Sequence, residues 1–141
     1  MKTAKQIIKK IAKFYNIKVE IQETEWFEGE RVFYKDRGVY VICNPVTNQT
    51  IYVGKGNIGI RQMKHRWKVT PTPAPSAVIT KSWQWLRENT ELDYKNWILL
   101  YFVLEKETEL SAMEGGLIHL LKPLANDETF KDEGRTINDS N

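Results

Sequence analysis

The sequence predicts an α+β fold. Two runs of β-branched and aromatic residues, 38–43 and 50–53, flank a turn at Asn44 and indicate a β-hairpin. Hydrophobic residues recur with helical spacing over 3–15 and 107–121, which indicates amphipathic helices. The chain has 141 residues, of which 41% are hydrophobic and 28% charged, so its size and composition are those of one compact domain.

Residues 1–34 are expected to form an N-terminal extension that packs on the core or targets the protein. The pattern over 3–15 places isoleucines on one helix face and lysines mostly on the other. Apolar and polar residues alternate over 17–22, which is typical of a strand. A turn at Glu28 to Glu30 then precedes a second apolar run at 32–34.

Residues 35–126 are expected to form the main domain. After the glycine-rich segment that follows the hairpin, 60–68 has the spacing of a short basic helix. An insertion at 69–96 begins with three closely spaced prolines, which enforce an extended loop, and continues with a helix over 81–89. Residues 97–104 are the longest apolar run and predict a buried strand.

The last predicted helix, 107–121, has Thr108 as its expected N-cap and Pro123 just beyond its end. Residues 127–141 are polar and acidic, and we expect them to form a loosely attached tail.

The net charge of +3 conceals blocks of opposite sign. Residues 1–18 hold six lysines and no acid, and 35–68 hold seven basic residues against Asp36 alone. Residues 105–141 carry four basic residues against nine acidic ones. A polyanion can therefore meet a local positive surface in the first two blocks. The alternative for 1–18 is that its lysines only solvate a surface.

Several functional classes are disfavoured. The apolar run 97–104 is far shorter than the roughly 20 residues of a membrane span, and the lysine-rich N-terminus lacks the apolar region of a signal peptide. We therefore expect a soluble, cytoplasmic protein with no membrane partner. Cys43 has no second cysteine to pair with, and together with His65 and His119 it falls short of the ligand count of a structural zinc site.

The sequence Gly54-Lys55-Gly56 lacks the remaining residues of a phosphate-binding Walker loop. No nucleotide cofactor is expected.

Six polar side chains carry the functional hypothesis. Two tyrosines lie in the paired strands, in Gly-Val-Tyr and Tyr-Val-Gly triplets, and an arginine and a histidine follow four residues apart on one helix face. A glutamate lies inside the last helix, directly before two glycines, and an asparagine follows it. In chain order they are Tyr40, Tyr52, Arg61, His65, Glu114 and Asn126.

This order of residues over 38–126 resembles the GIY-YIG nuclease family. The run from Tyr52 to Gly56, with Arg61 and His65, is similar to the branch that includes the LEM-domain-associated nucleases and small bacterial and phage proteins. Any one of these residues alone is more typical of a core aromatic or a solvated surface group. The occurrence of all six residues in this order, on the predicted strands and helices described above, favours the resemblance.

The resemblance implies a small three-stranded antiparallel sheet flanked by helices, with residues 1–34 as a helix and strand extension. It also implies hydrolysis of DNA phosphodiester bonds by water, with one Mg²⁺ or Mn²⁺ ion. Glu114 would be the metal ligand, because Mg²⁺ prefers oxygen donors and takes its other ligands from water and phosphate. Arg61 would bind phosphate oxygens through its planar fork.

The family suggests Tyr40 as the base that accepts a proton from the attacking water. A phenol is a weak base at neutral pH, so His65 is the rival for this role, and the sequence leaves the assignment open. Tyr52 would orient the water or Tyr40, and Asn126 would support the local backbone. Gly115 and Gly116 suggest that a strand or a substrate approaches the helix beside Glu114, or that the helix is kinked.

DNA is the expected partner, and four basic side chains near the site are expected to contact its phosphates without reading sequence. These are Lys55, Lys64, Arg66 and Lys68. A double-strand break with one active site per chain would need two chains, as in a homodimer, or two successive encounters.

Two alternatives stay open: a catalytically inactive DNA-binding module with this fold, and an interaction protein that docks a partner through 1–34. Three other features have structural interpretations. Tryptophans 67, 83 and 85 are expected to pack a core rather than stack on bases, Cys43 to be a buried inert thiol, and His119 to be structural.

Overall fold

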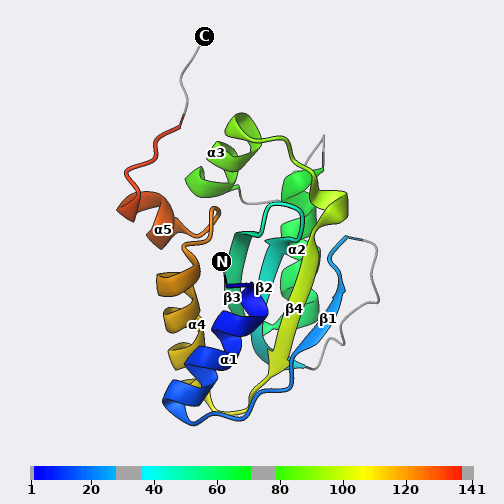
Figure 1. The fold of residues 1–141 in the computed structure, drawn as a ribbon. Helices are drawn as coiled ribbons and strands as arrows, with labels where there is room; N and C mark the ends of the chain where they lie inside the picture. Colours follow the sequence, from blue (N-terminus) through cyan, green and yellow to red (C-terminus); the bar gives the residue numbers. More distant parts are fainter. Residues whose placement is uncertain (1, 28–35, 71–78, 138–141) are drawn as a thin grey trace.

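The computed structural model describes residues 2–27, 36–70 and 79–137. Within these residues the chain forms five α-helices, one short 3₁₀ helix and one four-stranded antiparallel sheet, with helices on both faces of the sheet (Figure 1). The α+β prediction is confirmed. The predicted strand at 32–34, the turn before it and the proline loop at 71–75 lie outside the described residues.

The sheet has the strand order β1-β4-β2-β3. Its members are β1 (Gln22–Glu25), β2 (Arg37–Asn44), β3 (Gln49–Asn57) and β4 (Ile98–Val103). The hairpin of β2 and β3 is confirmed, and it places Tyr40 opposite Gly54 and Ile42 opposite Tyr52. This register puts both tyrosines on the same face of the sheet, because side chains alternate with a period of two.

The expected number of three strands is wrong, because the N-terminal extension supplies a fourth. Strand β1 pairs with β4 along its outer edge, from Gln22 opposite Tyr101 to Glu25 opposite Ile98. The predicted strand over 17–22 therefore begins only at Gln22. Ile17 is buried in the core instead, and it is joined to the end of the first helix by a backbone hydrogen bond to Ala12.

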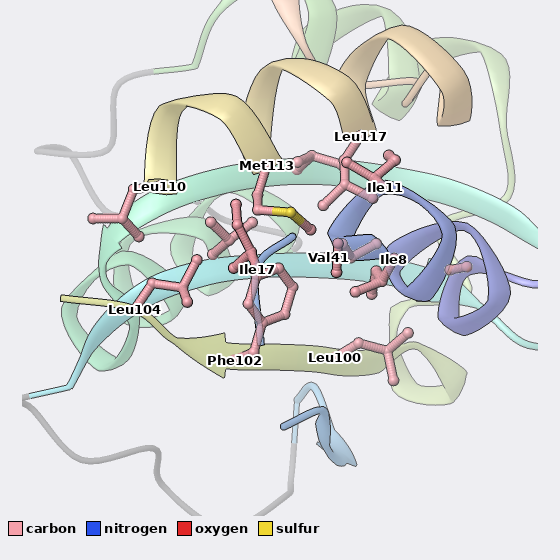
Figure 2. Packing of buried hydrophobic residues seen from close by; sticks show 14 of the residues in the cluster. Ile8, Ile11, Ile17, Val41, Leu100, Phe102, Leu104, Leu110, Met113 and Leu117 are labelled. Carbon is pink, nitrogen blue, oxygen red and sulfur yellow. The ribbon is translucent and has the colours of Figure 1, made fainter. Parts of the chain in front are cut away.

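One face of the sheet is covered by α1 (Ala4–Tyr15) and α4 (Glu107–Leu121). Thr3 is the N-cap of α1, and its side chain accepts a hydrogen bond from the backbone N–H of Gln6 in a capping box. Ile8 and Ile11 of α1 pack with Met113 of α4 in the core between helices and sheet (Figure 2). The extension is thus an integral part of this hydrophobic core.

The two glycines of α4 have different surroundings. A Cβ added to Gly116 would lie 3.1 Å from Cγ2 of Ile11, whereas one added to Gly115 would meet no atom within 4 Å. The close approach expected at these glycines is therefore that of α1 at Gly116. Helix α4 begins at Glu107 with Lys106 as its N-cap, so the expected N-cap Thr108 is already the second helical residue.

The opposite face is covered by α2 (Ile58–Val69) and α3 (Lys81–Asn89), and the 3₁₀ helix Tyr94–Asn96 leads into β4. The second core cluster includes Trp83 and Leu86 of α3, together with Trp26 and Trp97. The Nε1–H of Trp26 donates to Oε1 of Gln62 at 2.9 Å, which ties the end of the extension to α2.

The chain after α4 is ordered along the edge of β3. The backbone N–H groups of Leu124 and Ala125 donate to the carbonyls of Thr50 and Ile51 at 3.1 and 2.8 Å. The expected loose tail then begins with a helix, α5 (Asp127–Asp132), in which Phe130 is buried. The burial of this one aromatic ring explains why a mostly polar segment docks on the domain.

None of the helices in the described part of the chain is both long and apolar enough to cross a bilayer.

Candidate active site

The centre of the candidate site is a cluster of three rings, of which Tyr40 and His65 are buried and Tyr52 is partly buried. Tyr40 from β2 and Tyr52 from β3 have ring centroids 6.1 Å apart, and the Tyr52 and His65 rings are 4.4 Å apart. The hydroxyl oxygen of Tyr40 lies 2.9 Å from Nε2 of His65 on α2. The hairpin register and the docking of α2 on the sheet thus unite three of the six residues proposed from the sequence.

Trp83 closes this cluster from the α3 side. Its ring stacks on His65 with centroids 5.5 Å apart, and it lies 5.9 Å from the ring of Tyr52. The sequence placed Trp83 in a core, which is correct, but did not link it to the site. No spacing signal connects a residue of α3 with the hairpin, because only packing brings α3 beside α2.

His65 is neutral in this environment. Burial, together with the smaller effect of the charges of Lys68 and Arg61, lowers the pKa of His65 to about 3. The Nζ of Lys68 lies 3.3 Å from Nδ1 of His65. An ammonium group has donors only, so Nδ1 accepts this hydrogen bond and the ring proton of neutral His65 is on Nε2. His65 therefore donates to the oxygen of Tyr40.

Lys68 interacts with an aromatic ring and with an acidic side chain as well as with His65. Its ammonium lies 5.4 Å from the centroid of the Trp83 ring, in cation–π range. Burial lowers the pKa of Lys68, whereas the charge of Asp127 favours its protonated form. The sequence suggested Lys68 as a phosphate contact, but its geometry assigns it to His65.

The two phenols are both protonated in the protein alone. Burial raises the pKa of Tyr40 well above its usual range, and Tyr52 adds to this effect while Arg61 opposes it. Burial also raises the pKa of Tyr52 to about 12, with Glu114 as the next contributor. Positive charge near the site is therefore what favours a phenolate here.

Glu114 reaches the cluster from α4. It lines a cavity of about 170 Å³ together with Tyr52, Trp83 and Asn126, and with Lys68 and the first residues of α5. Burial raises the pKa of Glu114, and the positive charges of Lys55 and Arg61 oppose the rise. The carboxylate of Glu114 is therefore half-buried and lines the same cavity as Tyr52. The positive charges of Lys55 and Arg61 act on it.

Arg61 lies at the exposed side of the site. A Cβ added to Gly56, whose φ is +125°, would come within 3.4 Å of Nε of Arg61. The charge of Arg61 acts on Tyr40, Tyr52 and Glu114 alike. Arg61 forms no ion pair within residues 2–27, 36–70 and 79–137, so its guanidinium is available to an anion.

Asn126 clamps the edge strand beside Tyr52. Its Nδ2 donates to the carbonyl of Val53 at 2.8 Å, and its Oδ1 accepts from the N–H of Val53 at 2.9 Å. The side chain is almost fully buried. Asn126 thus satisfies both backbone groups of the residue between Tyr52 and Gly54, which is the backbone support expected from the sequence.

The other basic residues proposed for DNA contact differ in their surroundings. The Nζ of Lys55 donates to Glu107 at 3.0 Å and to the hydroxyl of Ser111 at 2.8 Å. Arg66 donates through Nε and a terminal nitrogen to the carbonyl of Trp26, at 2.9 and 2.6 Å. Lys64 is exposed on α2. Arg66 therefore has a structural role, and Lys64 has the solvent-facing placement that a phosphate contact needs.

Two residues lie apart from the site. His119 is exposed on α4. Cys43 is a buried free thiol whose pKa is raised to about 12, chiefly by burial.

Comparisons of the chain with protein-family models, with curated proteins and with solved structures found no match. Within the described part of the chain, no group of three or more histidine, cysteine or acidic residues is placed to hold a metal ion. Asp127 and Glu128 line the same cavity as Glu114, so a metal held there by Glu114, water and substrate oxygens would lie beside two further carboxylates.

Proposed function

We propose that the protein is a GIY-YIG-type endonuclease that hydrolyses DNA phosphodiester bonds with one Mg²⁺ or Mn²⁺ ion. The observation that carries this proposal is the hydrogen bond of 2.9 Å between Tyr40 and His65, beside a cavity that Glu114 lines. Residues from two strands and two helices, up to 74 positions apart in the chain, meet there as the family resemblance requires.

The residues present suit a one-carboxylate metal site. Mg²⁺ binds hard oxygen ligands and usually keeps several waters, so Glu114 can suffice where a substrate phosphate completes the shell. A bound ion would neutralise charge on the phosphate and on the leaving 3′ oxygen. The raised pKa of Glu114 fits a carboxylate placed where a cation would relieve its unfavourable burial.

Arg61 would bind the scissile phosphate. Its guanidinium is exposed, lies next to Gly56 and forms no ion pair within the described residues. Two parallel N–H groups of arginine match two phosphate oxygens, and the charge is permanent. The same charge opposes the rise in the pKa of Tyr40 that burial causes, so Arg61 would favour the phenolate form of Tyr40.

The geometry favours Tyr40 over His65 as the base. The lone pair of neutral His65 is at Nδ1 and is used by Lys68, while its Nε2 proton points to Tyr40. His65 therefore has no free acceptor for a proton from water. A hydrogen bond donated to Tyr40 stabilises a phenolate, so His65 would assist Tyr40 as a positioning residue.

One observation favours a second candidate, a DNA-binding module without activity. Tyr40 is only 1% exposed and His65 only 4%. Burial this deep is also what a hydrogen-bonded core pair would show. The two candidates make the same prediction for DNA binding and opposite predictions for cleavage.

The test is cleavage of supercoiled plasmid and of labelled duplex, flap and junction DNA by the full chain with Mg²⁺ or Mn²⁺. Glu114→Gln and Arg61→Gln should each reduce cutting by about 10² or more. DNA affinity should be retained in Glu114→Gln, whereas Arg61→Gln also removes one phosphate contact and should bind somewhat more weakly. Glu109→Gln removes the same charge from the same helix and should cut normally. Cutting retained in Glu114→Gln would contradict the proposed site, and DNA binding without cutting under either metal would favour the second candidate.

A further inference from the structure

The outer side of α1 is a continuous basic surface. Four lysines and one glutamine, Lys2, Gln6, Lys9, Lys10 and Lys13, line a shallow depression of about 390 Å³. These five residues, which we call the α1 lysine face, are all exposed. None of its lysines forms an ion pair within the described residues, whereas Lys5 on the neighbouring side of the helix pairs with Glu23 at 2.8 Å.

Two exposed aromatic rings adjoin this face at the end of α1. Phe14 is 80% exposed and Tyr15 is 46% exposed, and their ring centroids are 5.0 Å apart in an edge-to-face arrangement. Phe14 follows Lys10 by four residues, so both project from the same side of the helix. The exposed ring of Phe14 does not contribute the stabilising free energy that a buried ring would. It lies next to a surface that is otherwise charged.

The chemistry of this surface favours nucleic acid over lipid. An amphipathic helix binds a bilayer by inserting its apolar face, but Ile8 and Ile11 of α1 are already buried against α4 and the sheet. What α1 leaves outside is a row of ammonium groups and a pair of rings. Lysines along a groove with adjacent aromatics are the features that bind single-stranded nucleic acid, through phosphate contacts and base stacking.

We propose that the α1 lysine face, with Phe14 and Tyr15, binds a single strand of DNA. The lysines would contact successive phosphates, and the two rings would stack on unpaired bases. This inference deepens the proposed endonuclease function and rests on it for the choice of DNA. Helix α1 lies on one face of the sheet and α2, which carries His65, on the other (Figure 1). The strand bound by α1 would therefore lie across the sheet from His65, on the side of α4, the helix that packs on α1 and carries Glu114.

The experiment measures binding of fluorescent oligonucleotides by anisotropy in EDTA, where no cutting occurs. The probes are a dT 20-mer and a blunt 20-base-pair duplex, compared over a range of salt concentrations. Lys9→Gln with Lys13→Gln should lower affinity for both probes and reduce the salt dependence for the dT probe by roughly 0.7 per lost phosphate contact. Lys95→Gln with Lys122→Gln removes the same charge from exposed positions outside α1 and should bind as the wild type does.

Phe14→Ala separates stacking from charge. It should weaken binding of the dT probe by roughly fivefold to a hundredfold, the range for one lost stacking contact, and leave duplex binding unchanged. Equal loss for both probes, or no loss for either, would overturn the proposal. Vesicles of phosphatidylserine and phosphatidylcholine form a third arm, and Phe14-dependent binding to vesicles but not to DNA would overturn it in favour of a membrane contact.

The two proposals fail in distinguishable ways. If the wild-type protein cuts plasmid but the α1 variants bind the dT probe normally, only the α1 inference is wrong. If the variants lose binding as expected but no metal supports cutting by the wild type, only the endonuclease proposal is wrong.

Discussion

The hydroxyl oxygen of Tyr40 accepts a hydrogen bond from Nε2 of His65, with 2.9 Å between the two atoms. The direction of this bond follows from Lys68, whose Nζ occupies the Nδ1 side of the ring at 3.3 Å. Burial keeps His65 neutral, so the ring has one proton to donate and one lone pair to offer. The histidine is therefore arranged to support Tyr40 rather than to accept a proton itself.

Replacing Lys68 should change the state of the His65 ring. In Lys68→Met the donor at Nδ1 is lost, so we expect the protonated Nε2 form to lose its dominance and the pKa of His65 to rise. The rise follows because the charge of Lys68 is the second-largest cause of the lowered value, after burial. Long-range ¹H–¹⁵N spectra distinguish the two ring tautomers. The chain has two histidines, so exposed His119 is an internal reference. A wild-type His65 protonated on Nδ1 would contradict this arrangement.

Removing the Tyr40 hydroxyl should abolish cutting at a modest loss of stability. Tyr40→Phe deletes the proposed base, for which we expect a rate loss of roughly 10²–10⁴. It also leaves the buried Nε2–H of His65 without its acceptor, which should lower the free energy of unfolding by about 1–3 kcal/mol. Plasmid nicking and urea unfolding measure the two effects. Tyr94→Phe, in a partly buried ring that contacts Phe27, is the matched control and should cut normally.

The two glycines Gly54 and Gly115 should respond in opposite ways to alanine. A Cβ at Gly54 would lie 2.4 Å from the hydroxyl oxygen of Tyr40, so Gly54→Ala should displace the ring, break its bond to His65 and abolish cutting. Gly115 has open space, and Gly115→Ala should raise the free energy of unfolding by roughly 0.5–1 kcal/mol through helix propensity. Thermal unfolding and nicking assays test both. Loss of cutting in a stable Gly115→Ala protein would instead show that substrate needs this space.

Stability should fall on both sides of neutral pH. The pKa of His65 is about 3 in the folded protein and near 6.5 when unfolded, so below pH 6.5 the unfolded chain binds a proton that the folded one does not. At pH 5 this should remove about 2 kcal/mol from the free energy of unfolding. On the alkaline side, the pKa of Tyr52 is about 12 against 10.0, so stability falls as the pH rises above 10.

Urea unfolding between pH 4 and 8 measures the acid limb. The contribution of His65 should disappear in His65→Gln, whose stability depends less on pH, whereas His119→Gln should behave as the wild type does. An unchanged pH dependence in His65→Gln would show that His65 is not the group responsible.

Asn126→Asp should destabilise the edge of the sheet. The carboxylate can still accept from the N–H of Val53, but its second oxygen would face the Val53 carbonyl, to which the amide now donates at 2.8 Å. We expect the free energy of unfolding to fall by about 1–3 kcal/mol. The exposed Asn48→Asp makes the same chemical change and loses only a long, solvent-exposed hydrogen bond of 3.4 Å to the carbonyl of Lys2, so it should alter stability little. Wild-type stability of Asn126→Asp would contradict the clamp on β3.

Local patterns were sufficient for most elements of the fold. Helix α1, the β2–β3 hairpin, α3 and the buried β4 lie close to where periodicity and turn residues place them, because these signals are contained in neighbouring residues. The predictions of a strand over 17–22 and of a loose tail after 126 were wrong, because the structure of these segments depends on contacts with residues far away in the sequence. Strand β1 forms where the chain can pair with the edge of β4, and α5 docks on the domain because Phe130 is buried there.

The sequence by itself determined the α+β class, the β-hairpin that carries Tyr40 and Tyr52, and the helical spacing of Arg61 and His65. The register that places both tyrosines on one face of the sheet was decided by the structure. Only the tertiary structure decided that Glu114 faces the same cavity as Tyr52, that Trp83 stacks on His65 and that Lys68 sets the direction of the bond to Tyr40. The physical reason is that these two kinds of interaction act over different distances along the sequence. Backbone propensity acts over a few residues, whereas the pKa of a buried group and the partner of its proton are set by whichever side chains packing brings beside it.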